Sequence, residues 1–352
     1  MDVNVNRRGR LRVNKKRIVE IVFFLLVMAL SFYTVFCGQD MEQVMAALAN
    51  LSPSFLCLSL VTALFFVSAE GIMIYYLLHS LNGKSSLMRC IGYSFIGFFY
   101  SGITPSATGG QPMQLYYMCK DKNSMPHASV VLMTVALLYK LVLVLIGIVM
   151  LVSWHKPLKS YLQEYFPLYL LGLMLNLLLV LLLLAVMLAP EMMKNLMLRS
   201  EKLLVALRVL KPSKQRREKV GQFVASYQGA VRFLLENKKK VWNVCLFTFL
   251  QRCSVFVLTW VVYRGFALEG ADVVTVMCLQ ASVYIAVDML PVPGAQGITE
   301  LMYRNIFAGI FTGGYLMPSV YVTRGISFYF LLIVGIVVIG INYVSGRRQV
   351  CR

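Results

Sequence analysis

The sequence predicts an all-α polytopic membrane protein, with about six full transmembrane helices and two re-entrant or broken helical hairpins that form an inverted repeat. Three observations predict this class. The 352 residues are 59% hydrophobic and only 14% charged, with a mean hydropathy of +0.72, whereas soluble domains are closer to half apolar and a quarter charged. Long apolar runs recur along the chain. Two Pro/Gly-rich stretches break the apolar pattern, once in each half.

The first apolar run, at 18–37, follows a basic N-terminal segment, 1–17, that holds seven Lys/Arg. It lacks the short apolar core and small-residue cleavage site of a signal peptide, so we expect a retained span. Five further runs are long enough to cross about 30 Å of hydrocarbon at about 1.5 Å per residue. They are 54–78, 128–152, 167–189, 241–263 and 319–344.

Two shorter runs, 90–103 and 273–290, each end in one of the broken stretches, and sidedness decides how they cross. Segment 190–240 holds 13 Lys/Arg against four Glu, so the positive-inside rule places it in the cytoplasm with the N-terminus. A single crossing by 90–118 would place that segment outside. We therefore expect 90–118 to enter from the cytoplasm and return, and 273–310 to do the same from the other side.

This topology divides the chain into five parts. They are a basic cytoplasmic N-terminus (1–17), a transmembrane half with the first re-entrant motif (18–189), a basic cytoplasmic segment (190–240), a second transmembrane half with the second motif (241–345) and a basic cytoplasmic tail (346–352). Both termini are then cytoplasmic, and the predicted location is the bacterial cytoplasmic membrane.

The two broken stretches, "SGITPSATGGQPMQLYYM" and "VDMLPVPGAQGITELMY", align with each other. Pro105 falls on Pro291 and Gln114 on Glu300, at the same offset of 186 residues. Three predicted spans separate the stretches, so the hairpins enter from opposite faces, as in the inverted repeats of secondary transporters. The predicted backbone breaks are Pro105, Gly109, Gly110, Pro112, Pro291, Pro293, Gly294 and Gly297.

Broken backbone at membrane depth is tolerated only inside protein or beside a wet cavity. The free N–H groups at a half-helix N-terminus would suit an anionic group, so we expect a polar ligand near the midplane. The alternative is that both stretches are helix kinks that serve packing and bind no ligand.

Several polar and ionisable residues fall inside or beside apolar runs, where a charge costs at least about 2.5–3.5 kcal/mol. We expect Glu300 and Arg304, four residues apart, to share a helix face and pair. The cations suit a phosphate or another anionic headgroup. The acids would balance them, bind a cationic headgroup or carry a coupling proton. The predicted headgroup cavity comprises Glu70, Gln111, Gln114, Lys140, Arg252, Asp288, Glu300, Arg304 and Arg324.

The sequence offers no other chemistry. The eight cysteines are scattered without a CxxC pair and the three histidines are far apart, so we expect no disulfide framework, no metal site and no cofactor. "NGKSS" at 82–86 lacks the earlier glycine of a P-loop, since position 78 is Leu78. HExxH and GxSxG motifs are absent, and no catalytic residue is predicted.

The basic segment has helical periodicity over 191–237 in two pieces broken at Pro212. A helix lying in the cytoplasmic interface and attracted to anionic lipid fits this pattern. The sharper alternative is a docking site for a partner enzyme. Nucleic acid is not expected, although the net charge is +19, because membrane-flanking charge accounts for it.

The pair of motifs "GITPSATGGQPMQLYYM" and "PVPGAQGITELMY" resembles the lysylphosphatidylglycerol synthase transmembrane-region family, the flippase part of the bacterial multiple peptide resistance factor. Pro293, Gly294, Gly297 and Glu300 look like its Pro-Gly-x-x-Gly-x-x-Glu pattern. The resemblance covers nearly the whole chain. It implies translocation of a phospholipid or lipid-linked headgroup, related to lysyl-phosphatidylglycerol flipping and resistance to cationic peptides.

The chain departs from full-length relatives in ending at "GRRQVCR", without room for their synthase domain. A phosphatidylglycerol lysyltransferase label would then be inherited without the activity. Three other functions stay open: a membrane enzyme that modifies lipids, a secondary transporter of small anions, and a scaffold for a partner enzyme.

Overall fold

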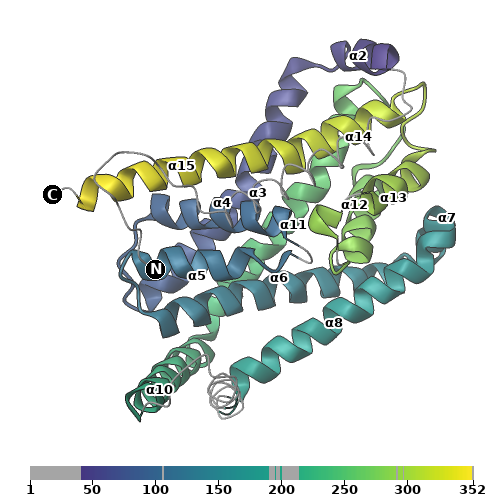
Figure 1. Ribbon diagram of the computed structural model, residues 1–352. Coiled ribbons are helices and arrows are strands. Elements are labelled where there is room, and N and C mark those ends of the chain that lie inside the picture. The colour runs from purple at the N-terminus through teal and green to yellow at the C-terminus, as the bar shows by residue number, and fades with distance from the viewer. Residues whose placement is uncertain are drawn as a thin grey trace.

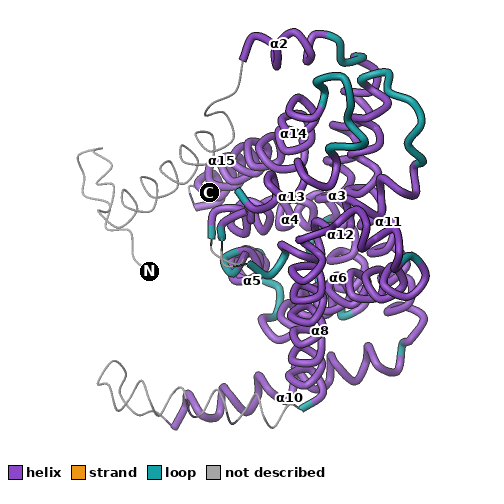
Figure 2. Tube along the Cα trace, turned by 90° about the vertical axis from the view of Figure 1, so that its right-hand side faces the viewer, coloured by secondary structure: helices purple, strands orange, loops and turns teal. Residues whose placement is uncertain are grey.

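The computed structural model describes residues 41–104, 107–189, 195, 199, 214–290, 292–295 and 297–350. Over these residues the protein is built from helices alone, as the sequence predicts (Figure 1, Figure 2). Four expectations fall outside the described residues: the span at 18–37, the two residues Pro105 and Pro291, and the first piece of the basic segment.

Five helical stretches are long and apolar enough to cross a membrane: Pro53–Ser80, Met125–Ser153, His155–Leu188, Lys238–Gly265 and Leu316–Asn342. They confirm the five predicted spans that lie within the described residues. Three of the helices begin with proline in the first turn, where its missing N–H costs no hydrogen bond and its fixed φ suits the helix. The exposed side chains of these helices are mainly Leu, Ile, Val and Phe, as lipid requires.

The first two of these spans are α3 (Pro53–Ser80) and α6 (Met125–Ser153). The third combines the short helices α7 (His155–Leu162) and η2 (Gln163–Tyr165) with α8 (Phe166–Leu188). The fourth is α11 (Lys238–Gly265). The fifth runs through α14 (Leu316–Arg324), a π-helical turn η4 (Gly325–Phe330) and α15 (Leu331–Val350).

Helices α3 and α11 pack antiparallel through the centre of the molecule. The Ser52 N–H donates to the Gly265 carbonyl at 3.0 Å, where α3 begins and α11 ends. At the other end, Asn243 Nδ2 donates to the Tyr76 hydroxyl at 3.2 Å. The outer helices, α8 on one side and α15 on the other, flank this centre in Figure 1.

The first broken stretch is a helical hairpin made of α4 (Leu87–Ile103) and α5 (Gly110–Lys120). Its open end is closed by polar side chains: the Tyr93 hydroxyl donates to Asp121 at 2.5 Å, and Asn123 donates to Ser85 Oγ at 2.7 Å. The start of α4 and the end of α5 therefore lie at one face, where α3 ends and α6 begins. The chain enters and returns on the same side, as predicted.

The second broken stretch is a hairpin made of α12 (Val273–Val287), a short turn η3 (Pro293–Ala295) and α13 (Ile298–Phe307). Tyr263, near the end of α11, accepts a hydrogen bond from the Ala271 N–H at 3.1 Å and packs edge-on against Phe311, with ring centroids 5.6 Å apart. Both ends of this hairpin therefore lie at the face where α11 ends and α3 begins. The two hairpins open at opposite faces, which is the geometry of an inverted repeat.

Two helices lie outside this core. Helix α2 (Met41–Ala49) packs beside α14, and α10 (Lys214–Glu236) packs on α6 and α11. The buried side of α10 is apolar and comprises Val224, Tyr227, Ala230, Val231 and Leu234. All of these residues except Val224 join a hydrophobic cluster with α3 and α6. The second piece of the basic segment is thus helical, and protein rather than lipid covers much of its apolar side.

Candidate functional site: a charged cavity between two hairpin tips

At the tip of the first hairpin, side chains satisfy the broken backbone. Thr104 Oγ1 accepts from the Gly109 N–H at 2.9 Å and donates to the Tyr100 carbonyl at 2.7 Å. Ala107 has a positive φ of 55°. Gly110 begins α5 against α4: a Cβ there would lie 2.0 Å from Ser101 Oγ and 2.7 Å from the Gly97 carbonyl oxygen. Glycine at 110 therefore allows the two arms to meet.

At the tip of the second hairpin, Glu300 holds the break. Its Oε2 accepts from the Gly297 N–H at 2.6 Å, and its Oε1 accepts from Arg324 Nε at 2.6 Å. Arg324 also donates to the Gly294 carbonyl at 3.0 Å. Gly294 and Gly297 have φ of 60° and 81°, values that favour glycine.

This arrangement corrects the expectation that the half-helix N-terminus seats an external anion. The Glu300 carboxylate already occupies the N-terminus of α13 and supplies the negative charge that the helix end attracts. The second break is therefore closed by the chain's own ion pair.

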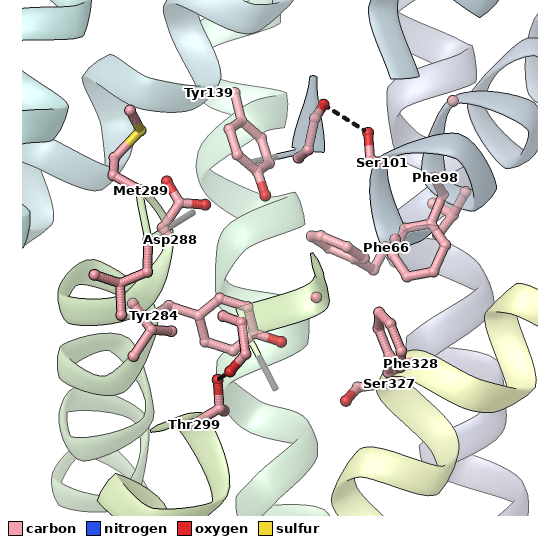
Figure 3. A pocket seen from close by; sticks show the side chains of 18 of the residues that line it. Phe66, Phe98, Ser101, Tyr139, Tyr284, Asp288, Met289, Thr299, Ser327 and Phe328 are labelled. Atoms are coloured by element: carbon pink, nitrogen blue, oxygen red, sulfur yellow. Dashed lines mark hydrogen bonds between the residues drawn. The ribbon is translucent and has the colours of Figure 1, made fainter. Parts of the chain in front are cut away.

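The two tips meet at a cavity of about 450 Å³. Residues of α3, α4, α5, α6, α12, α13, α14 and η4 line it, with Leu179 of α8. Figure 3 shows Tyr139 and Asp288 on one side, Phe66, Phe98 and Phe328 on the other, and Tyr284 between them. The cavity thus combines aromatic walls with ionisable groups, as ligand sites commonly do.

Two ion pairs cross this cavity lining. Lys140 of α6 is bonded to Asp288, which ends α12, and Arg324 of α14 is bonded to Glu300 of α13. The four side chains retain only 9% to 17% of their exposure. Charges this far from water are strongly coupled, and removing one partner leaves the other uncompensated. Both pairs tie the second hairpin to a spanning helix.

Glu70 of α3 differs from the other four ionisable groups in the lining. Its Oε1 accepts from the amide of Gln114 in the first hairpin at 2.6 Å, and Gln114 is neutral. Among the described residues, no ion pair holds Glu70, whereas Asp288 and Glu300 are matched by Lys140 and Arg324.

Arg252 of α11 lies behind this wall. Its guanidinium stacks on Tyr139, with Cζ 3.1 Å from the ring centroid, and the residue is fully buried. None of its three side-chain nitrogens finds a hydrogen-bond partner among the described residues. A cation–π contact stabilises by about 0.5–2 kcal/mol, whereas each unsatisfied buried donor group costs about 1–3 kcal/mol.

Residues 17–335 match the sequence model of one protein family, the lysylphosphatidylglycerol synthase TM region. The chain belongs to this family. The match covers both hairpins, four of the five described spans and most of the fifth, so every residue of the cavity lining falls within it. No curated protein matches the sequence.

The family's membrane fold brings together most of the predicted headgroup-cavity residues. Glu70, Gln111, Gln114, Lys140, Asp288, Glu300 and Arg324 line one cavity. Of the predicted breaks within the described residues, Gly294 lines it, Gly109, Gly110 and Gly297 flank it, and Pro112 and Pro293 lie in the first turns of α5 and η3. Their role in binding stays a prediction.

Two residues that were predicted to line the headgroup cavity, Arg304 and Arg252, lie outside it. Arg304 is exposed and outside the cavity, and the expected Glu300–Arg304 pair is replaced by Glu300–Arg324. The reason is that Glu300 turns back onto its own N-terminus, away from the next turn of α13. Arg252 is not in the lining, because Tyr139 covers it.

Sequence reasoning missed the aromatic wall formed by Phe66, Phe98, Tyr139, Tyr284 and Phe328. The tyrosines left a usable signal, since a hydroxyl in an apolar helix seeks a polar partner, and Tyr139 directly precedes Lys140. The described residues contain no group of three His, Cys, Asp or Glu placed to hold a metal ion.

Proposed function

We propose that this protein is a lipid flippase of the bacterial cytoplasmic membrane, which moves a phospholipid or lipid-linked headgroup between leaflets. The observation that carries the proposal is the cavity where two hairpins from opposite faces meet, lined by five acidic and basic side chains among helices that are long and apolar enough to span a membrane. Charges are retained there because a polar group must pass. Membership of the lysylphosphatidylglycerol synthase TM region family supports the same function.

The cavity lining favours a headgroup that carries an amine. Both cations of the lining are already paired, and among the described residues the hydrogen-bond donor to the Glu70 carboxyl is the neutral amide of Gln114. Tyr139, Tyr284 and Phe66 line the same cavity, and aromatic faces attract organic ammonium groups. An aminoacylated phospholipid such as lysyl-phosphatidylglycerol has this chemistry, which links the proposal to resistance against cationic peptides.

The inverted arrangement of the hairpins supports alternating access to the two leaflets. Each hairpin covers the cavity from one face, and the pairs Lys140–Asp288 and Glu300–Arg324 fasten the second hairpin to the spanning helices α6 and α14. Glu70–Gln114 fastens the first hairpin to α3. Exchange of these contacts would open one side and close the other.

The test is a leaflet-exchange assay with purified protein in liposomes that carry fluorescent phosphatidylglycerol, phosphatidylethanolamine or lysyl-phosphatidylglycerol. We expect faster exchange than in empty liposomes, with the amine-bearing lipids preferred. Glu70→Gln should reduce that preference about 10- to 100-fold, because a charge-assisted contact is replaced by a neutral one. Glu164→Gln, an exposed acid outside the cavity, is the matched control.

Three results would contradict the proposal. Folded protein that does not accelerate the exchange of any tested lipid between leaflets would refute the flippase function. Uptake of a small anion without lipid exchange would favour a secondary transporter. Formation of lysyl-phosphatidylglycerol from lysyl-tRNA by the purified chain would favour the lipid-modifying enzyme.

A further inference from the structure

Arg252 is a buried cation that no ion pair or hydrogen bond from the described residues satisfies. It lies on α11 with no exposed surface, and all three of its side-chain nitrogens lack hydrogen-bond partners among the described residues. Arginine has five N–H donors and no means of losing its charge in a protein. Buried polar groups nearly always have a hydrogen-bond partner. Three unsatisfied nitrogens on one buried guanidinium therefore indicate a partner from outside the chain.

The cavity lies directly on the other side of Tyr139. That ring lines the cavity and stacks on the guanidinium at 3.1 Å. One aromatic side chain therefore separates the guanidinium from the cavity.

The other cations of the site are already in use. Lys140 is bonded to Asp288, and Arg324 is bonded to Glu300 and to the Gly294 carbonyl. A headgroup that enters with a phosphodiester brings an anion that neither can take without breaking an ion pair. Arg252 has free donors in the planar fork that matches two phosphate oxygens.

We propose that Arg252 binds the phosphodiester of the transported lipid, and that Tyr139 covers this subsite and turns aside when the lipid enters. The inference rests on the proposed function and adds the group that recognises the phosphate, opposite the amine held by Glu70. The ligand chemistry is a phosphate oxygen pair, and we assign its source to the lipid rather than to free phosphate.

The experiment compares wild type with Arg252→Gln, Arg252→Lys and, as a matched control on the same helix, Arg264→Gln, whose side chain is 38% exposed at the end of α11. Two readouts are taken: exchange of fluorescent phosphatidylethanolamine in liposomes, and thermal stability in detergent with and without a short-chain phosphatidylethanolamine. We expect Arg252→Gln to lower exchange about 10- to 100-fold and to abolish the stabilisation by short-chain lipid.

The unliganded stability of Arg252→Gln separates binding from structure. The guanidinium makes no hydrogen bond to the described residues, and its contact with Tyr139 stabilises by only about 0.5–2 kcal/mol. Its replacement by neutral glutamine, which removes a buried charge, should therefore leave the melting temperature without lipid nearly unchanged or raise it. Arg252→Lys should retain part of the exchange, since it keeps the charge and loses the fork. Arg264→Gln should match wild type in both readouts.

Three outcomes would overturn the inference, and a fourth would refute the function on which it rests. Exchange by Arg252→Gln at the wild-type rate would show that the phosphate is bound elsewhere. A lower melting temperature of the unliganded variant, with lipid stabilisation intact, would make Arg252 structural. Inhibition of wild-type exchange by millimolar inorganic phosphate, lost in Arg252→Gln, would assign the subsite to the free ion. Absence of exchange in wild type would instead refute the proposed function itself.

Discussion

The Glu300–Arg324 pair gives the sharpest test of how the second hairpin is held. Glu300→Gln keeps the shape of the side chain and one acceptor for the Gly297 N–H, but it leaves Arg324 without its counter-charge. Removing one partner of a buried pair costs about 3–5 kcal/mol. The two side chains are 14% and 9% exposed beside a cavity, so we expect the lower end, about 3 kcal/mol.

The chain provides a matched control in Arg232–Glu236. The same two atoms, Arg Nε and Glu Oε1, are 2.8 Å apart there, but the side chains are 82% and 61% exposed. Solvent screens an exposed i,i+4 pair, which therefore contributes little to stability. Glu236→Gln should change stability far less than Glu300→Gln.

Thermal unfolding of the purified protein in one detergent measures the difference. The entropy of unfolding, about 2.1 cal/mol/K per residue, amounts to about 0.74 kcal/mol/K for 352 residues, so a loss of about 3 kcal/mol lowers the melting temperature by about 4 °C. The double variant Glu300→Gln/Arg324→Gln should recover about 1–3 kcal/mol of this loss. Equal, small effects of Glu300→Gln and Glu236→Gln, without recovery in the double variant, would refute the reasoning.

Three further predictions concern packing, the other ion pair and topology. Gly110→Ala should destabilise the protein by about 1–3 kcal/mol in thermal unfolding, because the new Cβ would meet Ser101 and the Gly97 carbonyl. The control Gly221→Ala in α10, where no atom lies within 4 Å of the added Cβ, should be neutral or stabilising by up to about 1 kcal/mol. Equal effects of the two substitutions would contradict the close approach of α4 and α5. Lys140→Met should lower the free energy of unfolding by about 3–5 kcal/mol, because it leaves Asp288 unpaired. The double variant Lys140→Met/Asp288→Leu should regain stability but not lipid exchange. Restored lipid exchange in the double variant would show that the pair is only structural. In a cysteine-free background, Lys214→Cys should react with a membrane-impermeant thiol reagent from the cytoplasm and Lys156→Cys in α7 from outside, whereas the reverse pattern, or both on one side, would invert or refute the topology.

The spanning helices and the hairpins could be predicted from the sequence because each leaves a local signal. Runs such as 128–152 are continuous and apolar, and the Pro/Gly stretches stand where membrane depth demands satisfied backbone. The opposite entry of the two hairpins followed from counting the spans between them. The structure confirms five of the six spans, and the first lies outside the described residues.

Residue partnerships could be predicted less well, because they depend on helix rotation and on long separations. Lys140 and Asp288 are 148 residues apart, and Glu300 and Arg324 are 24 apart. Helical spacing favoured Arg304 as the partner of Glu300, but the carboxylate bends back to cap α13. The π-helical turn at Gly325–Phe330, which places Ser327 and Phe328 on the cavity, has no signature in the sequence.

Passage of the headgroup through the cavity is tested by finding where the headgroup of a lipid lies during transport. A phospholipid with a photoactivatable headgroup is incorporated into liposomes with the wild-type protein and irradiated, and its attachment sites are mapped by mass spectrometry. We expect labels on the segments that line the cavity, namely 97–114 of the first hairpin, 135–140 of α6 and 283–300 of the second hairpin. Unlabelled lipid with the same headgroup should compete for these sites. Labels confined to the outer surface of α8, where Leu170, Leu177 and Leu181 are exposed, would show that the headgroup does not pass through the cavity.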